Sequence, residues 1–433
     1  MTAVEGWKTK QLKEIADIRV SNVDKKYSIQ EKPVKLCNYM DVYTNAYVTG
    51  KIQFMEASAT DAELERFRLQ KGDVIITKDS ETPDDIGIPA VISEQINNLV
   101  CGYHLALIRP NTDQVDSVYL AKQLSTSRVA RYFSLKASGS TRYGLPISAI
   151  EAVEIPIPTK AEQTKIAEIL STVDRAIEQT EALIAKQQRI KTGLMQDLLT
   201  RGIDEHGNLR TEQTHKFKDS PLGRIPVEWE VQPCAVLCLE IIVGIVIRPA
   251  QYYRPDGVPV LRSANVRENR ITTEDIVFMS ERDNEALSKS RLAKGDMVTV
   301  RTGYPGTTAV IPSELDGSNC VDIVISRPNR EKVRSEFLSI WVNSDRGKRQ
   351  VLEGQGGLAQ QHFNVGEMRT LLVKVPDISE QERIVNLLIM QNSAIDDLAK
   401  NQHKLCTIKT ALMQDLLTGK RRVTEILKIA TSD

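Results

Sequence analysis

The sequence predicts an α+β fold in which two α/β modules alternate with two long helices that pack as an antiparallel coiled coil, with an internal pseudo-twofold repeat. The first observation is a repeated stretch: Lys191–Thr200 recurs at Lys409–Thr418, with Ala411 in place of Gly193. The second is that this shift of 218 positions persists for about a hundred residues upstream. The third is a stripe of apolar residues at heptad spacing that leads into each copy. A long internal repeat of this kind indicates two related halves.

The repeat extends without a gap well beyond the matched stretch. Glu162-Gln163 pairs with Glu380-Gln381, and Pro158 with Pro376. Arg109-Pro110-Asn111 pairs with Arg327-Pro328-Asn329, and Gly139 with Gly357, still 218 positions apart. Each half is therefore expected to be a variable module followed by a long helix.

Each module has the composition of a mixed α/β domain. In the first, the turn signal Lys71-Gly72-Asp73 introduces the β-branched run Val74–Thr77, and in the second, Lys294-Gly295-Asp296 introduces Met297–Val300. Such runs after a turn signal are typical of strands. A glycine-rich loop follows later in each module, at 138–144 and at 354–357.

The two helical segments carry matching stripes. No proline occurs between Thr159 and Thr200, so about forty residues predict roughly 60 Å of helix. The apolar members of the two stripes are Ile166, Leu170, Val173, Ile177, Ile184, Leu194, Leu198, Ile384, Leu388, Ile395, Leu398, Leu405, Leu412 and Leu416. Polar stripe positions such as Gln187 and Gln391 favour one fixed register. We expect the two helices to bury these stripes against each other in opposite directions, with the modules at opposite ends.

Composition excludes several classes of protein. The 433 residues carry no net charge, so a DNA-binding role requires local basic surfaces or charge from other subunits. The six cysteines are scattered and have no zinc-site spacing, as in a reduced, cytoplasmic protein. The apolar run from Val231 to Ile247 is interrupted by polar residues, and no membrane association is expected.

The sequence contains no recognisable motif for catalysis or cofactor binding. There is no phosphate-binding Gly-x-x-x-x-Gly-Lys-Ser/Thr loop and no Asn/Asp-Pro-Pro-aromatic tetrad of amino-methyltransferases. Pro83-Asp84-Asp85 lacks the Glu-x-Lys that would complete a nuclease cluster. His104 is interpreted as a satisfied strand residue. We expect no catalytic residue, no metal site and no cofactor in this chain.

Three motifs together carry a family resemblance. Both helices begin with Pro-x-x-x-Glu-Gln, both end with Leu-Met-Gln-Asp-Leu-Leu-Thr, and the second module opens with Ser220–Pro226 followed by Trp229. This combination resembles the specificity (S) subunit of a type I restriction–modification system over essentially the whole chain. The first module keeps only Gly6-Trp7 of the opening motif.

The resemblance implies that each module is a target recognition domain that reads one half of a split, asymmetric DNA sequence. The helices would set the gap and dock two methyltransferase (M) subunits, and motor-nuclease (R) subunits would join that core. S-adenosylmethionine, ATP and magnesium would belong to these partners. The assembled complex would be a DNA adenine methyltransferase and ATP-dependent endonuclease, with this chain as its non-catalytic specificity subunit. The expected boundaries are 1–157 for domain 1, 158–203 for the central helix, 204–375 for the connector and domain 2, 376–425 for the distal helix and 426–433 for a tail.

Candidate DNA-binding residues lie on loops at the expected groove-facing edges of the modules. Arginine can fork onto guanine, asparagine and glutamine onto adenine, and carboxylates can accept from cytosine. The candidates are Lys25, Lys26, Lys78, Asp79, Glu81, Thr141, Arg142 and Tyr143 in the first module, and Arg262, Asn265, Arg301, Tyr304, Gln360, Gln361 and His362 in the second. Lys25 and Lys26 are candidates for phosphate contact, and Lys420, Arg421 and Arg422 are interpreted as a solvated tail.

Two other functions remain open from the sequence. A scaffold that binds proteins across a coiled-coil spacer predicts no sequence-selective footprint on DNA. A nuclease with an unrecognised site predicts magnesium-dependent cutting by the chain alone.

Overall fold

The computed structural model describes residues 6–353 and 362–430, which form two compact units. Unit 1 contains the chain up to Ala182 together with the chain from Lys400, and unit 2 contains Leu183–Ala399. Helices α7 (Lys160–Leu198) and α13 (Ile378–Leu417) each contribute to both units. The ends of both helices contribute side chains to the hydrophobic cores of the modules.

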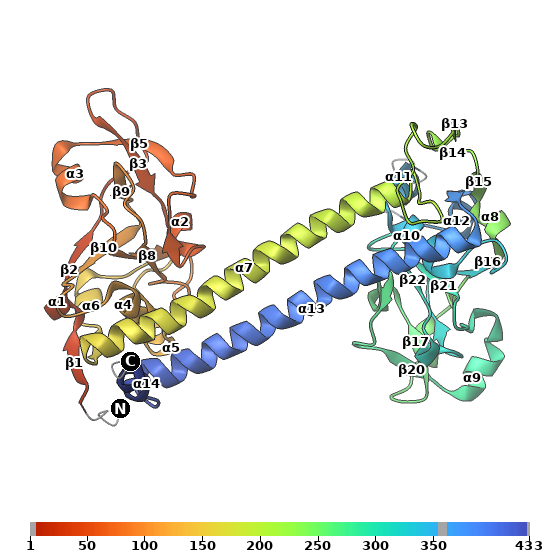
Figure 1. The fold of residues 1–433 in the computed structure, drawn as a ribbon. Coiled ribbons are helices and arrows are strands. Elements are labelled where there is room, and N and C mark those ends of the chain that lie inside the picture. Colours follow the sequence, from red (N-terminus) through yellow and green to blue (C-terminus); the bar gives the residue numbers. More distant parts are fainter. Residues whose placement is uncertain (1–5, 354–361, 431–433) are drawn as a thin grey trace. The chain divides into compact units, whose positions relative to one another are not determined.

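The first module is built on two small sheets (Figure 1). The larger sheet has the order β2 (Ala16–Val20), β10 (Leu105–Pro110), β6 (Val74–Thr77), β8 (Pro89–Ile92) and β4 (Tyr47–Val48). The smaller has the order β5 (Met55–Ala59), β3 (Lys32–Cys37) and β9 (Leu99–Cys101). All four residues of β6 are buried, which explains its unbroken β-branched sequence.

Short strand pairs and helices complete this module. The pairs are β1 (Lys8–Gln11) with β12 (Glu154–Ile157) and β7 (Asp79–Ser80) with β11 (Tyr143–Gly144). The helices are α1 (Leu12–Ile15), α2 (Tyr39–Tyr43), α3 (Asp61–Phe67), α4 (Ser117–Leu124), α5 (Ser127–Lys136) and α6 (Ile147–Glu151). Thr60 and Glu63 form a capping box at the start of α3, and the Asp116 carboxylate caps α4.

The second module repeats the topology of the first. Its larger sheet has the order β16 (Cys238–Val243), β24 (Ile323–Pro328), β21 (Met297–Val300) and β22 (Thr308–Val310). Its smaller sheet has the order β20 (Val277–Met279), β17 (Val258–Leu261) and β23 (Asn319–Cys320), and β15 (Glu230–Pro233) pairs with β25 (Leu372–Val375). The longer helices are α10 (Ser335–Asn343) and α11 (Asp345–Glu353), and the short ones are α8 (Cys234–Leu237), α9 (Glu281–Ala286) and α12 (Val365–Thr370). The predicted internal repeat thus extends to regions where the sequences of the two modules no longer align without gaps.

Within each unit, α7 and α13 lie side by side in opposite directions (Figure 1). In unit 1, Lys409 Nζ lies 2.8 Å from an oxygen of Asp174, and Gln402 Nε2 donates to Glu181 over 2.8 Å. In unit 2, the Gln391 amide donates to the side-chain oxygen of Gln187 over 2.9 Å. Residues earlier on α7 thus contact residues later on α13, as expected for antiparallel helices. Polar pairs mark the register, as the stripes predict.

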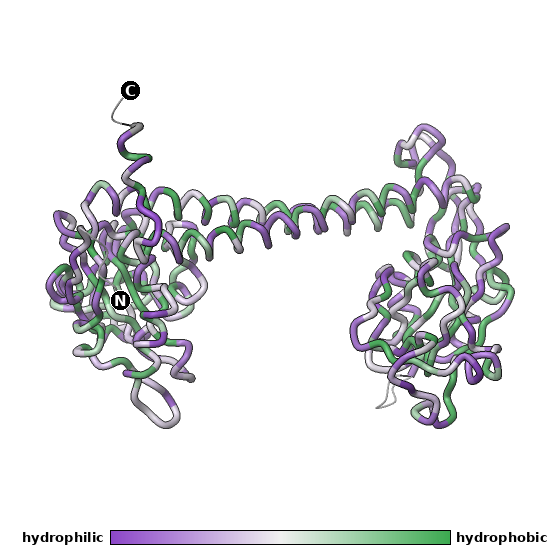
Figure 2. The backbone as a smooth tube through the Cα atoms, turned by 90° about the horizontal axis from the view of Figure 1, so that it is seen from below, coloured by the Kyte–Doolittle hydropathy of each residue, from purple (hydrophilic) through white to green (hydrophobic). Residues whose placement is uncertain are grey.

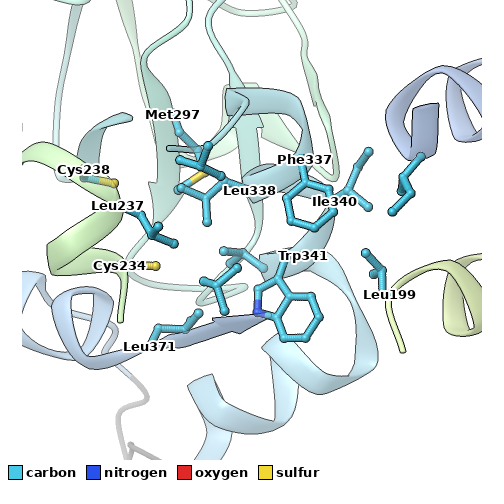
Figure 3. Close-up of a cluster of buried hydrophobic side chains, with 14 of the residues drawn as sticks. Leu199, Cys234, Leu237, Cys238, Met297, Phe337, Leu338, Ile340, Trp341 and Leu371 are labelled. Carbon is cyan, nitrogen blue, oxygen red and sulfur yellow. The ribbon is translucent and has the colours of Figure 1, made fainter. Parts of the chain in front are cut away.

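The striped faces are the protected faces of both helices. Ile166, Leu170, Leu198, Ile384, Leu388 and Leu416 are buried, and every other stripe residue is half-buried. Hydrophobic and hydrophilic segments alternate along both helices in Figure 2. Helix ends also enter the module cores: Leu416 and Leu417 join Ile166 and Leu170 in unit 1, whereas Leu198 and Leu199 join the core of unit 2 around Trp341 (Figure 3).

The glutamine of each Glu-Gln pair fastens its helix to its own module. The side-chain oxygen of Gln163 accepts from Asp116 N over 2.8 Å, and its amide donates to Gln114 O and Pro158 O. Gln381 makes the same three bonds, accepting from Arg334 N over 2.8 Å and donating to Lys332 O and Pro376 O. All six partners are related by the shift of 218 positions, so this contact is the same in both units.

The glutamate of each pair binds an arginine that follows the other long helix. In unit 2, Glu380 is 1% exposed and accepts from both terminal nitrogens of Arg210, from Ile203 N over 2.9 Å and from Trp229 Nε1 over 3.0 Å. In unit 1, Glu162 accepts from Arg422 Nε over 2.7 Å. Burial raises the pKa of Glu162, but the hydrogen bonds from Arg422 and Thr159 outweigh it and the net pKa lies below the ordinary value.

Of the basic cluster after α13, Lys420 and Arg421 are exposed as expected, whereas Arg422 is not the solvated residue that the sequence suggested. Arg422 is half-buried on Glu162 and stacks over the Trp7 ring at 5.8 Å, and Val423 is buried. Lys420 and Arg421 lie near Asp415. Helix α14 (Thr424–Ala430) occupies part of the expected tail. The reason is tertiary: a buried carboxylate at the start of α7 needs a cationic partner.

Candidate nucleic-acid interface

The first-module candidates gather at the end of β6. Lys78 follows this strand directly, and its ammonium donates to both oxygens of Asp79 over 3.0 and 2.9 Å. His104 Nδ1 lies 2.9 Å from the same carboxylate, and the Tyr103 ring lies 5.3 Å from Lys78 Nζ. We call Lys78, Asp79, Tyr103 and His104 the first-module cluster. His104 lies in the turn before β10 and not inside a strand, which corrects its interpretation as a strand residue.

Pairing of β7 with β11 brings the two predicted loops of this module together. Tyr143 lies opposite Ser80 and Gly144 opposite Asp79, so the glycine-containing loop borders the first-module cluster. Thr141 and Arg142 precede β11 and are exposed, and Glu81 is exposed just beyond β7. Sequence reasoning placed these residues on separate loops, because only the tertiary fold pairs such short strands.

A pocket beside this cluster contains aromatic residues that sequence reasoning missed. It is lined by Tyr39, Met40, Tyr43, Asp79, Ser80, Glu81, Thr82, Asp85, His104 and Arg142. The Tyr39 and Tyr43 rings stack with centroids 5.4 Å apart. Hydrogen bonding to Asp85 raises the pKa of Tyr43. The i,i+4 spacing of the two tyrosines was the available signal, but α2 is too short to be recognised from periodicity.

Lys25 and Lys26 lie on the exposed loop between β2 and β3. Burial raises the pKa of Asp41 on α2, and Lys25 is close enough to lower it in part. Lys26 Nζ lies 3.8 Å from Asp24 and its side chain is 90% exposed. Such a lysine is free to meet a phosphate, because a surface ion pair of this kind contributes little.

In the second module, Arg301 follows β21 as Lys78 follows β6. Its guanidinium is ion-paired with Asp322, and Nη2 lies 3.1 Å from His362 Nε2. The backbone of Arg301 also accepts from Phe363 N over 2.9 Å. Arg301 and His362, which were predicted separately, thus meet. Tyr304 lies farther along the same loop and is 83% exposed.

Arg262 and Asn265 form a turn of their own. The Asn265 amide accepts from Arg262 N over 2.9 Å and donates to Thr272 O and Glu274 O over 3.1 and 3.0 Å. Asn265 is fully buried, so its amide has no free edge for a base. It was chosen from the sequence as a base reader, but its environment makes it a structural residue. Gln360, Gln361 and the glycine loop 354–357 lie outside the described residues.

We call Arg301, Asp322 and His362 the second-module cluster. It shares two backbone positions with the first-module cluster but carries different side chains there. Lys78 and Arg301 both stand directly after the strand that follows Lys-Gly-Asp. His104 and Asp322 both stand directly before the next strand of the sheet. Lysine beside histidine in one module and arginine beside aspartate in the other present different hydrogen-bonding groups.

The described part of the chain contains no group of three or more histidine, cysteine or carboxylate side chains arranged to hold a metal ion. Asp84, from the dismissed nuclease motif, accepts a hydrogen bond from Ser134 over 2.8 Å. Over the same residues, no helix combines the length and the apolar character needed to cross a bilayer.

Comparison with known proteins agrees with this architecture. Residues 4–187 match the model of the type I restriction modification DNA specificity domain. The putative type I restriction enzyme MjaX specificity subunit of Methanocaldococcus jannaschii is 24% identical over 97% of this chain and 94% of its own length. The chain belongs to the type I restriction–modification specificity (S) subunits.

Other relatives of this S subunit agree with the assignment. The type I restriction enzyme EcoKI specificity subunit of Escherichia coli K12 is 22% identical over 73% of this chain and 67% of its own. The crystal structure of the type I restriction–modification S subunit from M. genitalium superposes with a TM-score of 0.57 at 14% identity, covering 95% of this chain and 96% of that one. The latter supports the fold. As an S subunit, this chain is the DNA specificity component, and a non-catalytic one, of a type I restriction–modification complex.

Proposed function

We propose that this S subunit reads a bipartite, asymmetric DNA target, with one module per half-site. The observation that carries the proposal is the pair of matching positions after β6 and β21, where Lys78 in one module and Arg301 in the other project from the same place in the fold. Side chains at the same place in the two modules should reach the same part of their half-sites. Because the side chains differ, they should read different bases. The two half-sites should therefore differ in sequence.

The proposed reading residues fall into two sets. In the first module they are Lys78, Asp79, Glu81, Thr141, Arg142 and Tyr143, with Lys25 and Lys26 as phosphate contacts. In the second they are Arg262, Arg301, Tyr304 and His362, together with Gln360 and Gln361. Asp79 and Asp322 each already hold a basic side chain, so DNA would have to exchange that ion pair for a contact with a base or phosphate.

We further propose that α7 and α13 set the number of unspecified base pairs between half-sites and dock two methyltransferase (M) subunits. Motor-nuclease (R) subunits would complete the restriction complex. S-adenosylmethionine, ATP and magnesium would be bound by these partners. Zero net charge in this chain suits such an assembly, because M subunits would supply much of the phosphate contact.

The test is to map methylated positions in DNA exposed to this S subunit together with its M partner. We expect methylation at two short, different half-sites separated by a fixed gap, and neither methylation nor cutting by the chain alone. Uniform methylation without a shared sequence would contradict sequence reading and favour a scaffold that only joins proteins. Magnesium-dependent cutting by the chain alone would instead indicate a nuclease.

A sharper test uses single substitutions. Arg301→Gln should relax selectivity at one base pair of one half-site by about 1–3 kcal/mol, because a forked guanidinium contact cannot be replaced by a neutral amide. Lys289→Gln, on an exposed lysine of the same module outside the cluster, is the matched control. Methylation rates on a library with each target base varied in turn would measure both variants. Loss spread evenly over all positions would assign Arg301 to phosphate contact.

A further inference from the structure

A pocket in unit 2 has a composition that DNA reading does not use. It lies between the last turns of α7, the start of α11 and the strand β25. Its lining consists of Thr192, Met195, Gln196, Leu199, Thr200, Leu222, Trp341, Ser344, Asp345, Arg346, Arg349 and Lys374. Its apolar wall is formed partly by Leu199 and Trp341, which also belong to the core cluster in Figure 3.

Lys374 is the feature of this pocket that calls for a partner. The residue is only 3% exposed, yet no described residue forms an ion pair with its ammonium or accepts a hydrogen bond from it. Burial, together with the smaller effect of the nearby Arg346, lowers the pKa of Lys374 to about 8. A buried cation without a counter-charge is costly, and such groups are ordinarily paired.

The rim of the pocket adds charge of the same sign. Arg346 and Arg349 stand one turn apart at the start of α11, and both are exposed. One carboxylate, that of the exposed Asp345, also lines the pocket. Counting Lys374 itself, three cations against one anion give the lining of this pocket an excess of two positive charges. Met195, Leu199, Leu222 and Trp341 supply the apolar surface beside it.

Unit 1 does not repeat the buried lysine of this pocket, although it repeats the fold around it. Pro156 stands where Lys374 stands, at the shift of 218 positions that relates β12 to β25. Gln123 stands in place of Trp341 and donates to Leu417 O over 2.8 Å. Arg128 stands in place of Arg346 and donates to Glu154 O over 2.8 Å. The buried cation is therefore not required by the fold, since the other unit does without it.

We propose that this pocket binds an acidic side chain of a partner protein, presented next to an apolar residue. The carboxylate would pair with Lys374, with Arg346 and Arg349 at the entrance, and the apolar neighbour would pack on Leu199 and Trp341. A DNA phosphate fits less well, because a duplex backbone cannot place a hydrated phosphate among four apolar side chains. The proposal is independent of how the modules read bases.

The test uses the full chain and a pair of short peptides that differ in one charge. The probes are acetyl-leucyl-glutamyl-leucinamide and its uncharged analogue acetyl-leucyl-glutaminyl-leucinamide. Binding is measured by calorimetry and by the rate at which an amine-reactive reagent modifies Lys374, read by mass spectrometry. We expect the acidic peptide to slow modification of Lys374 and to bind about tenfold more tightly than the analogue.

Variants and alternative probes decide the outcome. Lys374→Met should lose the preference for the acidic peptide. The double variant Arg346→Gln/Arg349→Gln should weaken this preference, and because both residues lie on the exposed rim it should not disturb the core. Lys289→Met serves as the control and should retain it. Equal binding of both peptides, or an unchanged preference in Lys374→Met, would overturn the proposal. Protection of Lys374 by inorganic phosphate but not by the acidic peptide would also overturn it, assigning the pocket to phosphate.

Discussion

Single residues show how tertiary environment sets the behaviour of charges that look alike in sequence. Lys374 and Lys122 are both buried lysines, but Lys122 is ion-paired with Asp174 whereas Lys374 has no acidic partner among the described residues. Burial is the largest influence on both, and it lowers the pKa of each. For Lys122 the nearby Asp174 opposes the shift, whereas for Lys374 Arg346 reinforces it.

Lys374 predicts a pH-dependent stability. Its pKa is about 8 in the folded chain and 10.5 is its ordinary value, so the unfolded chain binds more protons between these pH values. Stability should therefore rise with pH across this window, by up to about 3 kcal/mol. Lys374→Met removes the penalty, so its advantage over the natural chain should be largest below pH 8 and should shrink towards pH 10.5. Urea unfolding of both proteins at pH 7 and pH 10 measures this, and an advantage that does not change with pH would refute it.

Glu380 predicts a large loss on substitution. Glu380→Gln leaves Arg210 buried without its counter-charge and should destabilise unit 2 by about 3 kcal/mol, because breaking a buried pair exposes the full desolvation cost of the remaining ion. Glu382→Gln is the control on the same helix: its ion pair with Arg334 is half-exposed, and its loss should cost about 1 kcal/mol or less. Thermal unfolding followed by calorimetry compares the two. Equal effects would argue against a special role for the buried pair.

At the scale of elements, each long helix begins on one module and ends on the other. The Glu-Gln pair holds the start, and the apolar residues of the repeated Leu-Met-Gln-Asp-Leu-Leu-Thr motif hold the end. The two halves therefore share the same sequence at the points where a helix contacts a module. Between these points, the polar residues of the stripes set the register of the two helices. Asp174 adds a contact that unit 2 lacks, since Asn392 stands at its repeat position.

The equivalence of the two glutamines predicts equal effects in separate places. Gln163→Ala should free Asp116 N and Gln381→Ala should free Arg334 N, each at a cost of about 1–3 kcal/mol. Because each glutamine bonds only within its own unit, hydrogen exchange should accelerate around α4 in the first variant and around α10 in the second. Gln179→Ala, at an exposed position of α7, should change neither. Acceleration in both modules from one substitution would contradict independent fastening.

At the scale of the whole molecule, each unit has cores of its own. One cluster joins the strands of unit 1 to α4, α5 and the helix ends, and another joins those of unit 2 to α10 and α12. Modules that fold on their own cores tolerate exchange, because few contacts of one core depend on side chains of the other.

Exchange of whole modules and changes in helix length test the division of labour. Replacing residues 1–157 by the first module of another S subunit should change one half-site and leave the other and the gap unchanged. Inserting one heptad at the same level of both α7 and α13, which keeps the stripes in register, should instead lengthen the gap and leave both half-sites unchanged. Sequencing of methylated DNA reads both outcomes. A change in both half-sites on exchange of one module would count against one module per half-site.

The sequence alone determined the duplicated plan of this S subunit. A repeat shift, two Glu-Gln helix starts and two heptad stripes are local patterns, and local patterns are what periodicity and capping rules can read. They predicted two α/β modules, two long helices and their mutual packing without any coordinates.

Only the tertiary structure decided what the polar side chains do. Asn265 has the side chain of a base reader but is buried in its own turn, and Arg422 resembles a solvated tail residue but binds Glu162. No sequence pattern distinguishes Lys374 from an ordinary surface lysine. Asn265 bonds to a residue 7 positions away, and Arg422 bonds to one 260 positions away. Lys374 is unusual because it has no such neighbour among the described residues. Desolvation and pairing are properties of the assembled environment, and no spacing rule along the chain contains them.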